Sequence, residues 1–529
     1  MHLQFVYDVA LIHPPSVYDF RKRGYPVVAP ISDVIPSRPV FDMYPAGFLS
    51  LASYLEERGV KVGLFNLAAL MLIDESFDVP SFLRSIKARI YAIDLHWLVH
   101  AQGAIEIARM IKRIHEAPVV LGGLSATYYW REILDNYSWV DYVVLGDTAE
   151  PALYYLYESL TGNKPLTEVP NLAYRAPEPR ANKVFAPCNL DEFRPKYDLF
   201  TRVVARSGVL PALPWADFFK NPIAAIITYK GCRYDCIACG GSRYAYGKLG
   251  RICLGVKSVN TILEEFKEIV ERLKAPVFFV GDLQVLGRRY VEKLLNLLRE
   301  EKSDAELIFE FFTPPPLDLL KIYRSSSDRV YLQISPEDPD EKIRMRYGRP
   351  YPNESLFKFA KNASMFERVD YYFMIGLPGQ RPGRSLGAFF KELYKIGGGK
   401  ANAFVAPLAP FVDPGSLAFE QPERHGYKLL AKTLGQHAEL LLQKPWYKML
   451  NYETDVMDRE TIARATYDAA YDLAKAKVEL GQLEPEFLEE LKAALERLEG
   501  PVADKRDLYP PSSEPLKPKL YAELFGHNF

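Results

Sequence analysis

One stretch of the chain reads Ile223-Ala-Ala-Ile-Ile-Thr-Tyr-Lys-Gly231-Cys232-Arg-Tyr-Asp-Cys236-Ile-Ala-Cys239. The apolar run at its start predicts a buried strand, and Gly231 lets the chain turn sharply into the following loop. The three cysteines have the spacing C-x3-C-x2-C. Three thiolates on a tight loop can bind three irons of a cubane cluster and leave the fourth iron open to another ligand.

Two other interpretations of these cysteines are a zinc knot with Cys253 as the fourth ligand, and buried thiols that bind nothing. Zinc sites usually present paired C-x2-C or Cys/His sets, and no second pair follows this loop. The spacing therefore favours an iron–sulfur cluster. We expect the remaining Cys188 to be a structural or free thiol.

Composition limits the class of protein. The 529 residues are enough for two or three domains, and 66 Lys+Arg against 67 Asp+Glu give a net charge of −1. This balance does not indicate a nucleic-acid-binding tail or a polybasic membrane surface. No apolar run reaches the ~18 residues of a membrane span, and the first residues resemble a buried strand more than a cleavable signal. Five cysteines, mostly unpaired by their spacing, favour a cytoplasmic location, and the residue usage favours a thermophile.

Residues 1–165 alternate short apolar runs with amphipathic stretches, which predicts an α/β domain with a doubly wound, flavodoxin-like parallel sheet. Amphipathic helices are expected over residues 46–58 and 102–114. The expected strands are residues 8–13, 60–65, 90–94, 118–121 and 141–145. Because ligands of such sheets bind at the carboxyl ends of the strands, the loops there are candidate binding sites.

The expected strand-end loops contain glycines and polar or aromatic residues. They are His13-Pro-Pro15, Asp94-Leu-His96-Trp97, Gly122-Gly123-Leu-Ser125 and Gly146-Asp147. Glycine at such a position allows the backbone to approach a ligand closely.

The α/β alternation resumes after a proline-rich segment, residues 166–222, which we interpret as a linker. Residues 223–416 predict a partial (βα)6, TIM-like barrel, with helices over residues 259–273 and 290–298. Its expected strands are residues 223–230, 277–281, 307–312, 330–334, 371–375 and 403–408. Residues 417–529 predict a helical C-terminal cap, with helices over 455–480 and 485–498 and a proline-rich tail from 509. His425 and His437 are interpreted as ordinary solvent or core histidines.

Unusual residues follow the expected barrel strands, where active groups of such barrels stand. The second strand leads into Gly281-Asp282, and the fourth ends in Ser335-Pro-Glu337 with Arg344 shortly after it. The fifth leads into Gly376-Leu-Pro-Gly379, and the sixth is followed by Asp413-Pro-Gly415-Ser416.

The cysteine loop, these motifs and the preceding glycine-rich α/β domain together resemble the cobalamin-binding-domain radical S-adenosylmethionine (SAM) family. The resemblance covers most of residues 5–160 and the barrel. It implies a [4Fe–4S] cluster on Cys232, Cys236 and Cys239, SAM on the open iron, and cobalamin on the N-terminal domain. The implied SAM contacts are Gly281, Asp282, Ser335, Glu337, Arg344 and Gly376. The implied cobalamin contacts are His96, Trp97, Gly122, Gly123, Ser125 and Gly146.

Two features depart from the family pattern. No D-x-H-x-x-G stretch follows the first strand, and an Asp94-x-His96 pair follows the third strand instead. His96 either approaches the lower face of cobalamin or bonds to Asp94 and shapes the loop. In the cysteine loop, Ala238 occupies the position that is usually aromatic.

The resemblance predicts an enzyme that reductively cleaves SAM to a 5′-deoxyadenosyl radical, with cobalamin-dependent methylation of an unactivated carbon as the favoured outcome. One alternative is a rearrangement or cyclisation enzyme that does not use cobalamin. The other is a zinc-stabilised, non-catalytic binding protein. The expected partners are a small-molecule or lipid substrate and an external reductant such as ferredoxin or flavodoxin, and the sequence leaves the substrate open.

Overall fold

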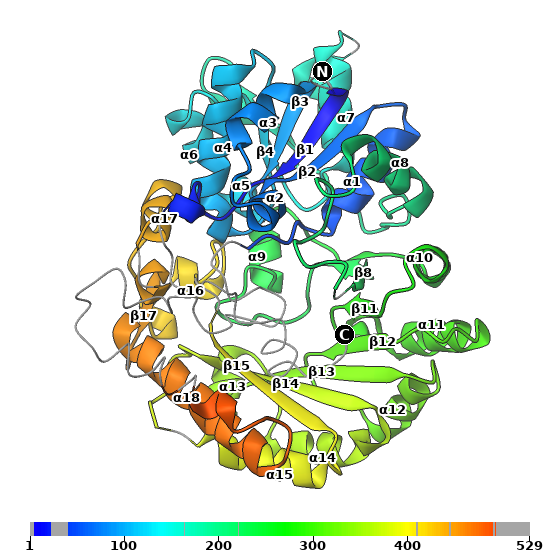
Figure 1. The fold of residues 1–529 in the computed structure, drawn as a ribbon, viewed down its shortest axis with the longest axis vertical. Helices are drawn as coiled ribbons and strands as arrows, with labels where there is room; N and C mark the ends of the chain where they lie inside the picture. The colour runs from blue at the N-terminus through cyan, green and yellow to red at the C-terminus, as the bar shows by residue number, and fades with distance from the viewer. Residues whose placement is uncertain are drawn as a thin grey trace.

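The structure, a computed structural model, describes residues 5–22, 41–162, 164–220, 222–383, 385–408, 411–443, 446–489 and 492. Two largely parallel sheets form two domains, the N-terminal one above the barrel in Figure 1. C-terminal helices run along one side of the molecule and contact both domains. Among the described helices, none has the length and apolar character needed to cross a membrane.

The N-terminal sheet has seven strands in the order β2-β1-β3-β4-β5-β6-β7. They are β1 (Phe5–His13), β2 (Val62–Asn66), β3 (Ile86–Asp94), β4 (Val119–Gly122), β5 (Tyr142–Val144), β6 (Leu172–Arg175) and β7 (Pro179–Ala181). The first five in this order are parallel, and β6 and β7 are antiparallel. The order 2-1-3-4-5 confirms the predicted flavodoxin-like arrangement.

Helices cover both faces of this sheet because alternate residues of its strands are apolar on both sides. Val9 and Leu11 of β1 pack in one core with three helices, and Ala10 and Ile12 pack in another core with three more. The first three are α1 (Gly47–Glu57), α7 (Glu150–Leu160) and α8 (Tyr197–Ser207). The second three are α3 (Val79–Ser85), α4 (Ala101–Ile114) and α6 (Trp130–Asn136).

The proline-rich segment 166–222 contributes β6, β7 and α8 to the N-terminal domain. The sheet therefore continues past residue 165, where we placed the end of the domain. Strands β6 and β7 are only four and three residues long, which is too short for an alternating pattern to reveal them.

The barrel sheet is parallel throughout, in the order β15-β14-β13-β12-β11-β8, with β8 and β15 at its edges. Its strands are β8 (Ala224–Ile227), β11 (Val277–Val280), β12 (Leu307–Phe311), β13 (Val330–Glu337), β14 (Arg368–Ile375) and β15 (Ala401–Pro407). Each of these strands overlaps a strand that we predicted from the sequence. The helices are α9 (Arg243–Lys248), α10 (Val259–Arg272), α11 (Arg288–Glu300), α12 (Leu317–Arg324), α13 (Glu341–Tyr347), α14 (Asn353–Asn362) and α15 (Leu386–Ile396).

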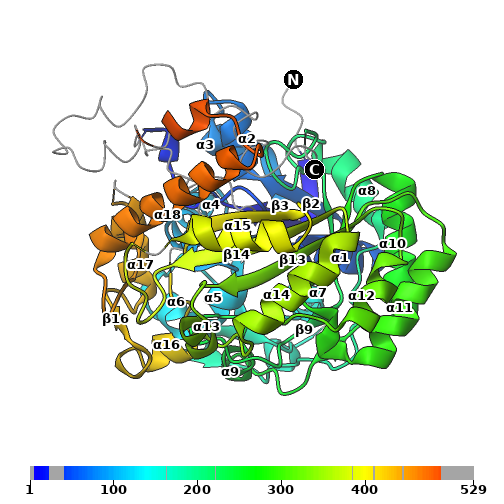
Figure 2. The ribbon, with the colours of Figure 1, turned by 90° about the horizontal axis from the view of Figure 1, so that it is seen from below.

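The C-terminal region contains helices α16 (Leu417–Glu420), α17 (Leu434–Leu441) and α18 (Arg459–Glu479). It also contains an antiparallel pair, β16 (Tyr427–Leu429) and β17 (Tyr452–Thr454), where we expected helix only. Figure 2 shows α18 beside α15 and β15, which it contacts. Most of the predicted helix 485–498 and all of the tail from 509 lie outside the described residues.

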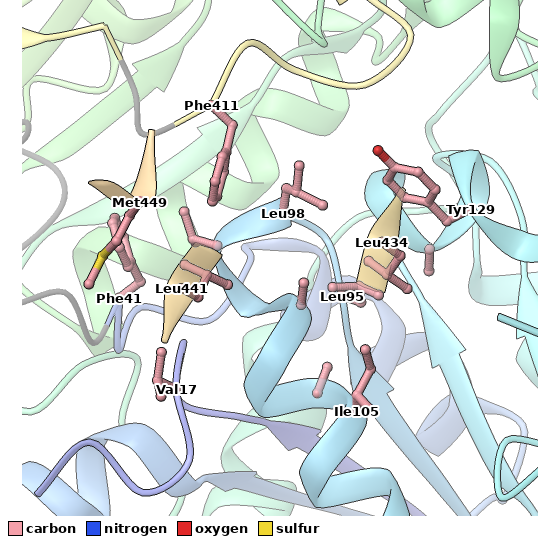
Figure 3. Close-up of a cluster of buried hydrophobic side chains, with 14 of the residues drawn as sticks. Val17, Phe41, Leu95, Leu98, Ile105, Tyr129, Phe411, Leu434, Leu441 and Met449 are labelled. Carbon is pink, nitrogen blue, oxygen red and sulfur yellow. The ribbon is translucent and has the colours of Figure 1, made fainter. Parts of the chain in front are cut away.

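A continuous hydrophobic core joins the C-terminal region to the N-terminal domain (Figure 3). Leu434 and Leu441 of α17 belong to the same buried cluster as Leu98 and Ile105 of the N-terminal domain. Tyr129 adds a hydrogen bond from its hydroxyl to the Lys432 carbonyl, 2.9 Å away. Burial of this much apolar surface stabilises one relative placement of the two parts.

Cys188 and Cys253 form a disulfide, which corrects our expectation of a lone thiol at Cys188; the other three cysteines are free. The pairing depends on a tertiary contact that the spacing of 65 residues does not reveal. The amide of Val256, in β10 (Gly255–Val256), donates to the Cys188 carbonyl at 2.9 Å, which brings the two segments together. Because Cys253 is oxidised in this pair, it is not the fourth ligand of a zinc knot.

We predict that Cys188→Ser lowers the midpoint of thermal unfolding by several degrees. A cross-link that closes a loop of 65 residues restricts the unfolded chain by about 4 kcal/mol in the chain-entropy relation. Thiol titration of the metal-free, denatured protein provides the direct check. Three reactive thiols are expected before reduction and five after it, and five before reduction would contradict the disulfide.

Candidate active site between two facing sheet edges

The cysteine loop is held in place by two other segments of the chain. The Ile237 amide donates to the Tyr347 carbonyl at the end of α13 (2.9 Å), and the Ala418 amide donates to the Ile237 carbonyl (2.8 Å). Gly348 has φ +125°, and a Cβ built there would lie 2.7 Å from the Cys236 Cα. Glycine is therefore required where the end of α13 approaches the loop.

Cys232, Cys236 and Cys239 are all free thiols in this loop. Backbone amides of Tyr234 and Gly241 donate to the sulfurs of Cys232 and Cys239 at 3.4 and 3.3 Å, which favours thiolate charge. Burial nevertheless raises the pKa of all three thiols, so a bound cation is needed to keep them ionised.

The described side chains contain no group of three or more His, Cys, Asp or Glu residues arranged to hold a metal ion. A cubane cluster makes a different demand on the protein, because each thiolate binds a different iron. Three free thiols on one firmly held loop fit that demand.

A set of charged groups surrounds the barrel-strand ends beside this loop. The Gly281 amide donates to Glu310 Oε2 at 2.9 Å, and Arg349 Nε donates to Glu337 Oε1 at 2.9 Å. Burial raises the pKa of Cys232 and of Cys236, and the positive charge of Arg349 partly offsets both shifts. The charge of Arg349 therefore acts on the cysteines of the loop.

Several atoms of this charged set have no partner in the part of the chain that the structure describes. Glu337 Oε2 and the Tyr229 hydroxyl are buried without a hydrogen bond. Glu310 accepts only the Gly281 amide, and Arg349 donates only through Nε. Buried charged and polar groups are stable when they are paired, so this set fits a bound zwitterion with an ammonium and a carboxylate.

Two of the expected SAM contacts are instead occupied within the protein. Asp282 accepts the amides of Gln284 and Phe312, each at 2.9 Å. The Arg344 guanidinium is fully buried and donates to the carbonyls of Pro336, Asp338 and Tyr351. Both side chains hold the strand-end loops in shape.

The other expected SAM contacts lie at the same edge of the barrel sheet. Ser335 lies near the end of β13, two residues before Glu337. Gly376 has φ +102° and donates its amide to Gln380 Oε1 at 2.8 Å. Our sequence reasoning did not select Glu310 or Arg349. Glu310 lies inside the predicted strand 307–312 and not in the loop after it. Arg349 is the last of three arginines in the stretch Arg344-Met-Arg346-Tyr-Gly-Arg349, of which we selected only the first.

The expected cobalamin contacts come together at the carboxyl ends of β3, β4 and β5. The Ser125 amide and hydroxyl both donate to the His96 carbonyl, at 3.1 and 3.0 Å. Gly123 has φ +116°, and a Cβ there would lie 2.4 Å from the His96 Cα. Gly146 follows β5 and donates to Thr127 Oγ1 at 2.9 Å, and Gly122 ends β4.

Asp94 pairs with His13 and not with the ring of His96. His13 Nδ1 lies 2.9 Å from Asp94 Oδ2, while the His96 backbone amide donates to Asp94 Oδ1 at 2.8 Å. The His96 ring makes no hydrogen bond to the described residues, and burial lowers its pKa. The ring of Trp97 stacks against His100 at 6.3 Å. The His96 ring also contacts the Trp97 ring edge-on at 5.4 Å, and a neutral imidazole that makes no hydrogen bond to the described residues is suited to contact a ligand.

The two sets of strand ends face each other (Figure 1). Lys230, two residues before the first cysteine, donates to the Asp147 carbonyl at 2.6 Å. Arg251 Nη2 donates to Asp147 Oδ1 at 2.8 Å, and Tyr128 donates to Glu420 Oε1 at 2.7 Å. The cysteine loop therefore lies against the edge that carries the expected cobalamin contacts.

Comparisons with known proteins agree with this division. Residues 33–153 match the family model of the B12 binding domain, and residues 226–383 match that of the Radical SAM superfamily. No curated protein matches the chain in sequence.

Solved structures with the same fold include two cobalamin-linked enzymes. The radical SAM methyltransferase TsrM from Kitasatospora setae, with tryptophan and a SAM analogue bound, has a TM-score of 0.56 at 13% identity over 80% of this chain and 78% of its own. The cobalamin-dependent SAM radical enzyme OxsB, with aqua-cobalamin and SAM bound, has a TM-score of 0.57 at 13% identity over 93% of this chain and 71% of its own. The chain thus joins a B12-binding domain to a radical SAM domain and is a radical SAM enzyme whose cofactors are a [4Fe–4S] cluster, SAM and cobalamin.

Proposed function

We propose that Cys232, Cys236 and Cys239 hold the [4Fe–4S] cluster of an enzyme that reductively cleaves SAM and methylates an unactivated carbon with the help of cobalamin. The observation that carries this proposal is the position of the three free thiols. They lie between charged groups on the barrel whose hydrogen bonds are incomplete and the carboxyl ends of the strands of the N-terminal sheet.

Glu310, Glu337 and Arg349 are proposed to hold the amino-acid part of SAM. This part carries an ammonium and a carboxylate, which match the two carboxylates and the guanidinium in charge. Gly281, Ser335 and Gly376 line the same edge. Asp282 and Arg344 act through the loops that they hold, since their own hydrogen bonds are made within the protein.

His96, Trp97, Gly122, Gly123, Ser125 and Gly146 are proposed to hold cobalamin. When bound, the cofactors supply the electron that breaks a C–S bond of SAM, the radical that abstracts hydrogen, and a carrier for the methyl group. The protein positions these cofactors and excludes water from the space between them. The continuous core around Leu98, Phe411 and Leu434 shields the joint between the domains from solvent, which protects reactive species from side reactions.

We predict that Cys236→Ala abolishes formation of 5′-deoxyadenosine after anaerobic reconstitution with iron and sulfide. The protein is incubated with SAM, hydroxocobalamin and reductant, and methyl transfer is followed with methyl-labelled SAM. Cys188→Ser is the matched control, since it removes a cysteine outside the loop and should keep the product. Stoichiometric zinc without cluster absorption or a Mössbauer signal in the wild type would favour a non-catalytic binding protein.

We predict that Arg349→Gln weakens binding of SAM to the reconstituted protein at least tenfold. Loss of a charge-assisted pair with the SAM carboxylate accounts for a change of this size. Equilibrium dialysis with labelled SAM measures it, and iron content shows that the cluster is retained. The control is Arg346→Gln, because Arg346 is half-exposed and pairs with Asp455 at 3.7 Å. Equal affinities of the two variants would remove Arg349 from the proposed site.

We predict that Gly123→Val reduces retention of cobalamin severalfold while iron content stays unchanged. A side chain at this position collides with the His96 backbone and displaces the loop that carries the expected contacts. Gly247→Ala in α9 is the control, since a Cβ there meets nothing within 4 Å. Absorbance of the protein after gel filtration with hydroxocobalamin gives the bound fraction. Full retention by the valine variant would place the cofactor elsewhere.

A further inference from the structure

Ile252 is an apolar side chain that the fold holds in contact with water. It is 96% exposed, more than any other large apolar side chain of the described residues. Both of its neighbours in the chain are fixed, since Arg251 is buried in an ion pair with Asp147 and Cys253 is joined to Cys188. Ile252 is therefore presented at a fixed place on the surface.

A second exposed apolar side chain, Phe185, comes from a neighbouring segment. The Arg251 guanidinium donates to the Pro187 carbonyl at 2.9 Å, and the disulfide follows one residue later in both segments. Residues 184–188 and 250–253 therefore lie side by side, and Phe185 is 44% exposed. We call these two segments the Ile252 patch. Exposed apolar residues that gather in one place mark a surface for another protein.

The Ile252 patch adjoins the start of the cysteine loop. Strand β9 (Tyr229–Lys230), which leads into this loop, pairs antiparallel with β10 and lies at the rim of the molecule in Figure 2. A Cβ built on Gly231 would lie 3.2 Å from the Arg251 Cδ and 3.8 Å from the Cys253 carbonyl oxygen. Ile252 stands between these two residues in sequence. The patch thus contacts the residue that precedes the first cysteine of the loop.

The charge beside the Ile252 patch is positive by a small excess. The two segments of the patch and the adjacent helix α9 contain no carboxylate. Their cations form ion pairs with carboxylates from other segments; they are Arg243, Lys248 and Arg251. Lys183, next to the patch, and Arg233, in the cysteine loop, are exposed and form no ion pair with the described residues. An acidic partner surface complements these two charges.

The proposed function requires a partner that brings an electron to this region. Each reductive cleavage of SAM consumes one electron, which the cluster on the cysteine loop receives from another molecule. Interfaces of proteins that exchange electrons are small, so a few exposed side chains are enough to form one. A patch in contact with the start of the cysteine loop gives such a partner a short approach to the cluster.

We propose that the Ile252 patch is the docking surface of a small acidic electron-carrier protein. The inference rests on the proposed function, because the carrier has a role only if the cysteine loop holds a cluster. Ile252 is the apolar anchor of the contact, and Lys183 and Arg233 attract the acidic surface of the carrier. The carrier is oxidised by one electron, and the same electron reduces the cluster.

The test measures how fast reduced flavodoxin bleaches the cluster absorbance of the reconstituted protein. Ile252→Glu should lower this rate at least tenfold, since the anchor is lost and the new charge repels the carrier. Ile252→Ser should lower it severalfold through loss of the anchor alone. Reduction by dithionite, which is small enough to need no docking surface, should proceed in both variants as in the wild type.

Leu160→Glu is the matched control for a charge at an exposed apolar position. Leu160 is 40% exposed and ends α7, which begins after the strand-end loop of β5, so it lies at the opposite edge of the N-terminal sheet. This variant should keep the wild-type rate with flavodoxin. Equal flavodoxin rates for Ile252→Glu and the wild type would overturn the proposal, as would a wild type that dithionite reduces and flavodoxin does not.

Cleavage of SAM with dithionite is measured separately for every variant. If all variants form 5′-deoxyadenosine with dithionite and their flavodoxin rates are equal, the docking surface is wrong and the proposed function stands. If the wild type holds no cluster and cleaves no SAM with dithionite, the proposed function fails, and the docking surface fails with it.

Discussion

The arrangement of the site depends on one buried ion pair between the two domains, Arg251 with Asp147. The side chains are 2% and 7% exposed. Removing two charges from water costs several kcal/mol per ion and is tolerated only when the remaining donors are satisfied. Arg251 meets this condition, since it also donates to the carbonyls of Pro187 and Cys253. The pair therefore fixes the loop after β5, the proline-rich segment at Pro187 and the segment around Cys253 in one geometry.

The charges at the barrel edge divide into two groups by whether their hydrogen bonds are complete. Arg344 and Asp282 make their hydrogen bonds within the protein, and removal of either side chain leaves backbone groups without partners. Glu310, Glu337 and Arg349 each make fewer hydrogen bonds than their side chains allow. An apoprotein holds such charges only if the rest of the fold compensates for their cost, which is the usual balance at functional sites. Completeness of bonding thus separates structural charges from those available to a ligand, although all five residues lie at the carboxyl ends of the barrel strands or in and just after helix α13, which follows β13.

The parts of the molecule that were predictable from sequence are those that local residue patterns determine. Strands such as β1 and β14 were predicted within a few residues because an apolar run is a local property of the chain. The cysteine loop and the glycines beside His96 were found because their spacing is local as well. Arg349 could not be distinguished from Arg344, since only the fold decides which guanidinium meets three carbonyls. The disulfide between Cys188 and Cys253 and the short strands β6 and β7 depend on contacts across many residues, which periodicity does not contain.

Glu337 connects these levels, because its two oxygens face two different environments. Oε1 accepts Arg349 Nε at 2.9 Å, while Oε2 is buried without a hydrogen bond from the described residues. The backbone turns sharply at Glu337, the last residue of β13. The positive φ of Glu337 produces this turn, and the three bonds of Arg344 to the neighbouring carbonyls hold it. The strained backbone of Glu337 and the three hydrogen bonds of Arg344 thus belong to one arrangement. In it, the structural cation Arg344 stabilises the backbone conformation that positions the carboxylate of Glu337.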